Sequence, residues 1–267
     1  MNILEAIKER RSVRSFDGKA LSEAVRNELL AFAAGVYNPF GGHFSIRLKS
    51  FNLKNGYKPN TYGIIKDAND FFLIGMADEE ATALATGFCF EQVVLKAWQL
   101  GLGTCWIAAT FKGTDFDNGE SWPDGETLKI ICPVGQAAKK SLMERITRFS
   151  LGSRNRKPFS DLFFTDSFKQ PLSPNSSFGE ALEMLRLAPS STNSQPWRVL
   201  TDNDTVHFYY LPKSRLSVLD TGIGICHFYE TEKYYGHTGA FYTLSTPPAV
   251  HDKWKYLVSY RRRNTNI

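Results

Sequence analysis

The sequence predicts an α+β fold of three layers (α/β/α), in which two pseudo-symmetric halves each carry a mixed sheet and a buried helix runs through the core. Three observations support this. Residues 81–100 are apolar on nearly every side of a helix, residues 71–76 form a short continuous apolar run, and the order helix, turn, strand occurs twice. A chain of 267 residues can hold one large domain or two small ones.

The first elements follow from hydrophobic periodicity. Residues 2–11 and 21–36 place apolar side chains at helical spacing, and Ser22 with Val25 three residues later gives half of a capping signal. Residues 43–52 alternate apolar and polar side chains, which indicates a strand. The apolar run 71–76 is typical of a strand buried on both faces.

The central part of the chain predicts the core. The helix at 81–100 is hydrophobic almost all round and stops at Gly101, so it should be buried. Residues 103–109 then continue into the core. Residues 128–134 are a further expected buried strand, which ends at Pro133 and Gly135.

A connector separates this part from a second series of elements. It is rich in Lys and Arg after Gly135 and is interrupted by Pro158, Pro171 and Pro174. Beyond it the periodicity predicts helices at 180–187 and 220–236 and strands at 197–200 and 205–210.

The two series resemble each other. Residues 29–40 and the strand after them parallel residues 181–190 and the strand that follows. We therefore expect a first half at 1–152 and a second half at 153–267, packed as one pseudo-dimeric unit; a chance likeness of two α/β segments is the alternative.

Composition excludes several classes of protein. No apolar run approaches the about 18 residues that span a bilayer, and the N-terminus lacks signal-peptide features, so a cytoplasmic protein that does not enter the membrane is expected. The cysteines and histidines show neither Cys-x-x-Cys nor His-Glu-x-x-His spacing; we expect buried free thiols and no metal site. The net charge is +5, and the run Arg261-Arg262-Arg263 is expected to be a solvated terminus, not a nucleic-acid site.

Two separated motifs carry chemistry. Arg10-Arg11-Ser12-Val13-Arg14 places guanidinium groups and a hydroxyl near a helix end, as a bound phosphate requires, although a solvated basic helix end has the same composition. Far along the chain, Pro189-Ser190-Ser191-Thr192-Asn193-Ser194-Gln195-Pro196-Trp197 offers many compact donors and acceptors beside an indole; a purely structural turn is its alternative.

With both motifs, and with Leu100-Gly101-Leu102-Gly103-Thr104-Cys105-Trp106-Ile107 as a third, the chain resembles the FMN-dependent nitroreductase family over most of its length. The resemblance implies a nitroreductase-like fold and a set of cofactor-binding residues. Arg10, Arg11, Ser12 and Arg14 would hold the FMN phosphate and ribityl chain, completed by Arg154 and Arg156. Pro189, Ser190, Ser191 and Asn193 would contact the isoalloxazine ring, and backbone amides around Ile107, Ala108 and Ala109 would reach flavin N5.

The order of the motifs departs from the ordinary family pattern. The arginine cluster occurs only in the first half, and the early turn at 35–42 has no serines; the second half keeps the turn and has no such cluster. This resembles the fused, internally duplicated branch of the family, in which one chain imitates a dimer and can act as a monomer. The two halves would then close one flavin pocket, with one flavin per chain.

The implied function is ping-pong hydride transfer from NAD(P)H through FMN to a small electron-poor acceptor such as a nitroaromatic or quinone. No side-chain acid or base is required, so no catalytic residue is assigned. A flavin-binding protein without turnover is one alternative. A basic nucleic-acid-binding protein is a weaker one, because only the excess charge supports it.

Overall fold

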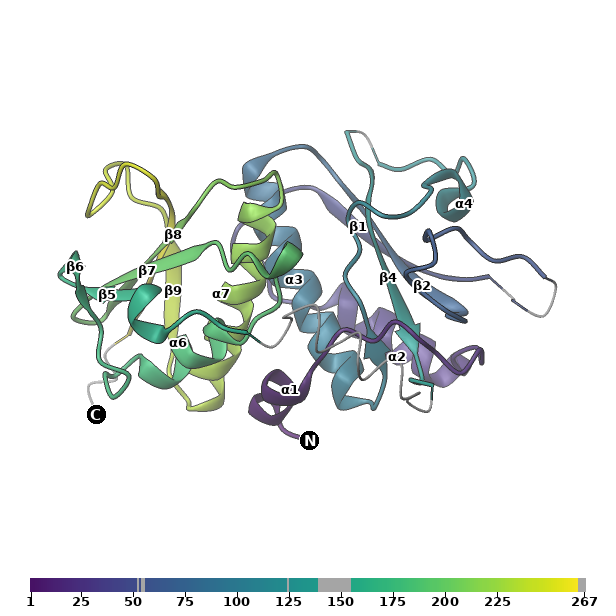
Figure 1. Cartoon of the computed structure of the whole chain (residues 1–267), viewed down its shortest axis with the longest axis horizontal. Coiled ribbons are helices and arrows are strands. Elements are labelled where there is room, and N and C mark those ends of the chain that lie inside the picture. Colours follow the sequence, from purple (N-terminus) through teal and green to yellow (C-terminus); the bar gives the residue numbers. More distant parts are fainter. Residues whose placement is uncertain (52, 54–55, 124, 139–154, 264–267) are drawn as a thin grey trace. The chain divides into compact units, whose positions relative to one another are not determined.

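The computed structural model describes residues 1–51, 53, 56–123, 125–138 and 155–263. The chain divides into two compact units. The first comprises Met1–Asn2 and Glu9–Ile146, and the second comprises Ile3–Lys8 and Thr147–Ile267. Helix α1, Ile3–Glu9, therefore belongs mostly to the second unit. The elements of each unit can be followed by colour and label in Figure 1.

The described part of the first unit contains an antiparallel sheet with the strand order β1-β2-β4-β3. Its strands are β1 (Phe44–Ser50), β2 (Asp70–Met76), β3 (Gly103–Thr104) and β4 (Thr127–Gly135), and its helices are α2 (Glu23–Ala34), α3 (Glu80–Gln99) and α4 (Thr114–Asp117). The expected helices and core strands are confirmed to within a few residues at each end.

The core of the first unit lies on both faces of β2. All seven residues of this strand are buried. Phe72 packs edge-on against Phe90 of α3, whereas its neighbour Phe71 packs against Phe116 of α4 in a second cluster. Fourteen of the residues of α3 are buried, which confirms the expected buried helix.

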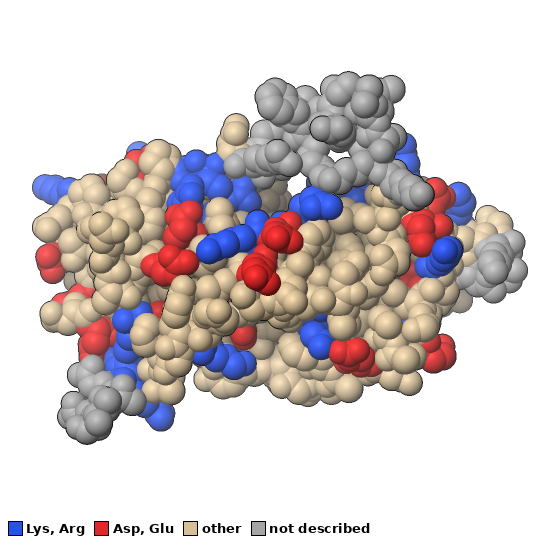
Figure 2. All heavy atoms as spheres, turned by 90° about the horizontal axis from the view of Figure 1, so that it is seen from below, with Lys and Arg blue, Asp and Glu red and all other residues tan. Residues whose placement is uncertain are grey.

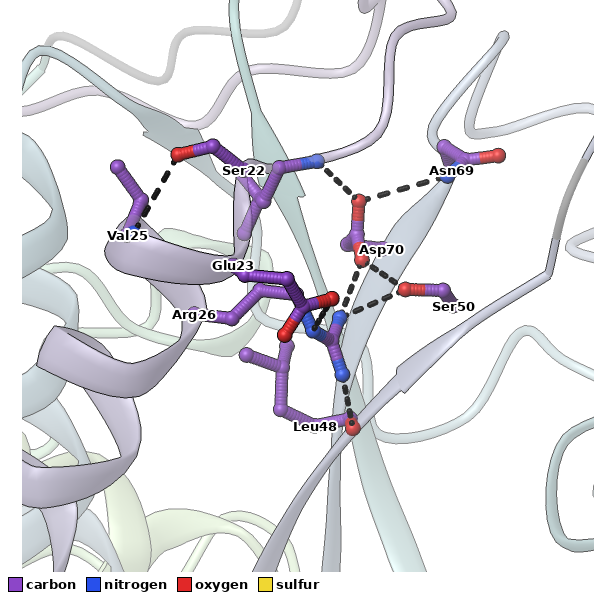
Figure 3. A network of polar contacts seen from close by, with 9 residues as sticks. Ser22, Glu23, Val25, Arg26, Leu48, Ser50, Asn69 and Asp70 are labelled. Carbon is purple, nitrogen blue, oxygen red and sulfur yellow. Dashed lines mark hydrogen bonds and ion pairs between the residues drawn. The ribbon is translucent and has the colours of Figure 1, made fainter.

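A buried carboxylate fastens α2 to this sheet (Figure 3). Asp70 accepts hydrogen bonds from Arg26 Nη1 at 2.6 Å, from Leu21 N at 2.8 Å and from the Ser50 hydroxyl. The helix begins at its expected cap, because Ser22 Oγ accepts a hydrogen bond from Val25 N. Since this carboxylate is fully paired, it has a structural role.

The second unit contains a mixed sheet with the order β6-β5-β7-β8-β10-β9. Among its described strands, β5 and β7 run parallel and the other neighbouring strands are antiparallel. Its elements are η2 (Phe159–Asp161), β5 (Phe163–Thr165), β6 (Ser167–Pro171), α6 (Gly179–Arg186), η3 (Ser191–Asn193), β7 (Trp197–Asp202), β8 (Thr205–Tyr210), α7 (Ser217–Tyr234), β9 (Gly239–Tyr242) and β10 (Lys255–Arg262).

The two units share one connectivity. In each, a helix is followed by two strands, a long buried helix and two more strands. The order is α2-β1-β2-α3-β3-β4 in the first unit, with the short helix α4 between β3 and β4, and α6-β7-β8-α7-β9-β10 in the second, with η3 between α6 and β7. The spatial orders β1-β2-β4-β3 and β7-β8-β10-β9 correspond position by position, and every neighbouring pair in both is antiparallel. The second unit adds β5 and β6 beside β7.

The C-terminal arginines differ from expectation. Arg262 is not solvated: it ends β10, its Nη2 donates to Glu232 Oε1 at 2.7 Å, and its Cζ lies 4.1 Å from the centroid of the Phe178 ring. Its side chain is 17% exposed. The expectation of a solvated basic terminus was wrong for this residue because the alternating apolar residues of β10 carry the chain back into the sheet.

The remaining expectations from composition concern cysteines, metals and membranes. All four cysteines are buried and free, as expected. The part of the chain that the structure describes holds no cluster of three or more His, Cys, Asp or Glu side chains that could bind a metal. In the same part, every helix is too short or too polar to cross a bilayer.

Candidate functional site

The arginine motif lies against the short strand β3. Ser12 forms a parallel bridge with Thr104, and Val13 N donates to the Thr104 carbonyl at 2.8 Å. Gly103 lies so close to the Val13 side chain that a Cβ on Gly103 would lie 2.6 Å from Val13 Cγ2. Gly103 is therefore the residue that lets the motif leave α1 in an extended conformation along the sheet edge.

Arg10 is the most deeply placed member of this motif. Its side chain is 5% exposed, and its Nε lies 3.6 Å from Oε1 of the fully buried Glu91 on α3. The other oxygen of Glu91 accepts a hydrogen bond from Trp106 Nε1 at 2.7 Å. Arg10 Nε and Nη1 are buried and have no hydrogen-bond acceptor among the described residues. A buried donor left without an acceptor costs about 1–3 kcal/mol, so this guanidinium can gain from an added anion.

The other motif residues surround this group with positive charge. Arg11 Cζ lies 5.2 Å from the centroid of the Trp98 ring, and its Nε is also buried without an acceptor in the described part of the chain. Arg14 is exposed. Burial raises the pKa of the Cys105 thiol, while Arg14, a hydrogen bond with Ser12 and Arg10 all act to lower it. The alternative of a solvated basic helix end therefore does not fit Arg10.

The serine-rich turn has an unusual backbone. Thr192, Asn193 and Gln195 all have φ near +50° (50°, 54° and 47°). Left-handed residues other than glycine cost about 1–3 kcal/mol each and persist only where surrounding contacts impose them, although Asn tolerates this region best. Two such contacts are hydrogen bonds from Gln195 N to Ser190 Oγ at 2.9 Å and from Ser191 N to Asp220 Oδ2 at 3.0 Å.

Asn193 and Arg156 are brought together. Arg156 Nη1 donates to Asn193 Oδ1 at 3.2 Å and its Nη2 to the Leu187 carbonyl at 2.9 Å, while Asn193 Nδ2 donates to the Asn155 carbonyl at 2.8 Å. Both ends of the Asn193 side chain therefore tie the turn to the segment before β5, which gives this residue a structural role in addition to any contact with a ligand. Arg154 lies outside the described residues.

Sequence reasoning missed two residues that shape this turn, Lys157 and Asp220. Lys157 Nζ donates to the Ser194 carbonyl at 3.2 Å, and its backbone N donates to Gln195 Oε1 at 2.8 Å. Burial, reinforced by Arg198 and Lys213, lowers the pKa of Lys157 to about 8. Asp220 lies in the first turn of α7. An Asp within the mostly apolar helix α7 is the sequence signal that could have identified Asp220.

The amides expected near flavin N5 are not equivalent. Ile107 N donates to the Ile131 carbonyl at 3.0 Å, and Ile131 N returns a bond to Ile107. The Ile107 amide is thus already used by the sheet. Ala108 is half-buried and Ala109 is exposed. The expected amide contact with flavin N5 therefore rests on these two residues.

The surface charge is mixed. On the face drawn in Figure 2, Lys and Arg side chains alternate with Asp and Glu over a large uncharged area. Pairs such as Lys49 Nζ with Glu120 Oε1, 2.6 Å apart, and Lys58 Nζ with Asp67 Oδ1, 2.9 Å apart, neutralise part of the positive charge.

Comparison with known proteins agrees with this fold. The chain has a nitroreductase fold. It belongs to the nitroreductase family, because residues 2–231 match the family model described as "Putative TM nitroreductase". A solved structure from Thermotoga maritima, described as a putative nitroreductase, is 21% identical and superposes with a TM-score of 0.63 over 98% of this chain and 93% of its own.

Shorter family members match about half of the chain. A putative nitroreductase from Exiguobacterium sibiricum in complex with FMN is 10% identical, with a TM-score of 0.43 over 55% of this chain and 96% of its own. A putative NADH dehydrogenase/NAD(P)H nitroreductase from Bacteroides thetaiotaomicron is 18% identical, with a TM-score of 0.42 over 52% of this chain and 88% of its own. No curated protein matches the sequence.

Proposed function

We propose that this protein is an FMN-dependent oxidoreductase of the nitroreductase type, which takes hydride from NAD(P)H and passes it to a small electron-poor acceptor such as a nitroaromatic or quinone. Family membership supports the reaction class. The burial of Arg10 is the observation that supports FMN as the cofactor. Its side chain is 5% exposed, and two of its buried donors lack acceptors in the described residues, so the guanidinium fits the phosphate of FMN.

The motif residues have separate roles in this proposal. Arg10, Arg11, Ser12 and Arg14, with Arg154 and Arg156, bind the phosphate and ribityl chain. Pro189, Ser190, Ser191 and Asn193 contact the ring, and the backbone amides of Ala108 and Ala109 face N5. Bound FMN supplies the acceptance and release of hydride. The protein binds, orients and shields the ring, and no side-chain acid or base is assigned.

We further propose that the chain is an internally duplicated nitroreductase that binds one FMN. The matching strand order of the two units supports the duplication. The arginine motif belongs to the first unit and the serine-rich turn to the second, so neither unit carries a complete set. The expected stoichiometry is one flavin per chain.

The absorbance spectrum of the purified protein tests the cofactor, and the oxidation of NAD(P)H with and without an acceptor tests the reaction. We expect a flavin spectrum, or its appearance on adding FMN. Protein that shows no flavin absorbance band, even after FMN has been added, would refute the proposal. Bound flavin without any NAD(P)H oxidation would instead favour the alternative of a binding protein without turnover.

A further inference from the structure

We propose that Asp220 is a positioning residue, which holds the Pro189–Asn193 turn in the shape that receives the flavin ring. This inference rests on the proposed function, because the ligand of the turn is the FMN assigned there. Asp220 itself is not expected to touch the cofactor. Its effect is transmitted through Ser191 and Ser194.

The geometry of the carboxylate supports this role. Asp220 is 3% exposed. Ser191 N lies 3.1 Å from Oδ1 and 3.0 Å from Oδ2, so one backbone donor is shared by both oxygens. The hydroxyl of Ser194 also hydrogen bonds to this carboxylate. Asp220 thus contacts the turn at two residues that flank the left-handed pair Thr192 and Asn193.

Position on the helix favours the charged form. Asp220 lies in the first turn of α7, a helix from Ser217 to Tyr234. The exposed N–H groups and the dipole at a helix N-terminus stabilise a negative charge. The polar groups that face the carboxylate from the turn are the Ser191 N–H and the Ser194 hydroxyl, and no cation is among the causes of its altered ionisation.

The turn needs such a restraint on this side. Its opposite side is tied by Arg156 to Asn193 and by Lys157 to the Ser194 carbonyl. Those contacts lie at Asn193 and Ser194, so they do not fix Ser191 at the beginning of the turn. The carboxylate of Asp220 supplies this second anchor. The left-handed pair Thr192 and Asn193 then lies between fixed contacts at Ser191 and Ser194, as strained backbone requires.

The anchor should weaken when it is protonated. Burial raises the pKa of Asp220 to about 7, against the opposing effects of Ser191 and Ser194. A carboxylate accepts hydrogen bonds more strongly than a neutral carboxyl group does. FMN affinity should therefore fall as the pH drops through about 7.

The test compares FMN dissociation constants from flavin fluorescence at pH values from 5.5 to 8.5 for the full-length wild type, Asp220→Asn and Ser194→Ala. We expect Asp220→Asn to weaken binding at pH 8 by about tenfold, the effect of one charge-assisted hydrogen bond, and to flatten the pH profile. Ser194→Ala removes a hydrogen bond that lowers the pKa of Asp220. The midpoint of the pH dependence of FMN affinity should therefore move to a higher pH in this variant. Glu230→Gln, which neutralises another carboxyl group of α7 whose pKa burial also raises, is the control and should leave the profile unchanged.

The outcomes separate this inference from the proposed function. Wild-type protein that binds no FMN at any pH overturns both. Wild-type protein that binds FMN, together with an Asp220→Asn variant of equal affinity and an identical pH profile, overturns the inference alone. If circular dichroism shows that Asp220→Asn does not fold, the Ser194→Ala variant provides the test. An unchanged midpoint of its pH profile of FMN affinity contradicts the role of Asp220, and a shift to higher pH supports it.

Discussion

Arg10 Nε lies 3.6 Å from Glu91 Oε1, and both side chains are buried in the first unit. The distance is that of an ion pair and exceeds a good hydrogen bond. Glu91 neutralises the arginine without using up its donors, because its second oxygen is bonded to Trp106. The result is a guanidinium that is held inside the fold and still has donors for a phosphate.

Glu91→Gln should strongly destabilise the fold. Removing one partner of a buried ion pair leaves the other charge uncompensated, which costs about 3–5 kcal/mol. Glu120→Gln is the control: Glu120 is half-exposed, pairs with Lys49, and should cost less than about 1 kcal/mol. Denaturant unfolding measures both, and equal losses would contradict the role of Glu91.

Gly103→Ala should displace the arginine motif. The new Cβ would meet Val13 Cγ2 at 2.6 Å, so β3 and the motif must separate. We expect a loss of stability of about 1–3 kcal/mol and weaker FMN binding. Gly113→Ala adds the same atom where nothing lies within 4 Å, and it should leave both quantities nearly unchanged. Fluorescence titration of the two variants would show equal affinities if the close approach were unimportant.

Stability should depend on pH through Asp220, in the direction opposite to FMN affinity. Burial raises its folded-state pKa from 3.8 to about 7. Between these values the folded protein binds more protons than the unfolded chain, so the free energy of unfolding should fall as the pH rises from 4 to 7 and then level off. Asp220→Asn should reduce this slope. Thermal melts of apoprotein across the range measure it, and an unchanged slope would mean that Asp220 titrates normally.

Arg262→Ala should destabilise the second unit, because it leaves Glu232 buried without its cation and removes the contact with Phe178. A loss of about 3 kcal/mol is expected. The neighbouring Arg263 is exposed, and Arg263→Ala should have little effect. If the melting temperature drops equally in both variants, the structural role of Arg262 is contradicted, and Arg261-Arg262-Arg263 would be a solvated terminus as the sequence predicted.

The long periodic elements were predictable from the sequence, and the short ones were not. The helices α3 and α7 and the strand β2 are apolar over enough residues to be recognised alone. The strand β5 has three residues and exists because it pairs with β7, which no local pattern encodes. The strand β10 was missed although Tyr256, Val258 and Tyr260 alternate with other residues, because the arginines after them were given more weight.

The candidate site was predictable to a similar extent. The motifs themselves were identified from residue type, but their supports were not. Glu91 and Asp220 lie within helices and reach Arg10 and Ser191 only through tertiary packing. A charged residue in the middle of an apolar helix is the signal that could have identified Glu91. The use of the Ile107 amide by Ile131 could not be anticipated, because it depends on strand register.

The most direct test of the central claim is a titration of apoprotein with FMN, followed by fluorescence quenching, for the wild type, Arg14→Ala and Asn193→Ala. We predict saturation at one FMN per chain for the wild type, and weaker binding for each variant, although one residue belongs to the first unit and the other to the second. Saturation at two FMN per chain, or a loss of affinity in only one of the two variants, would contradict it.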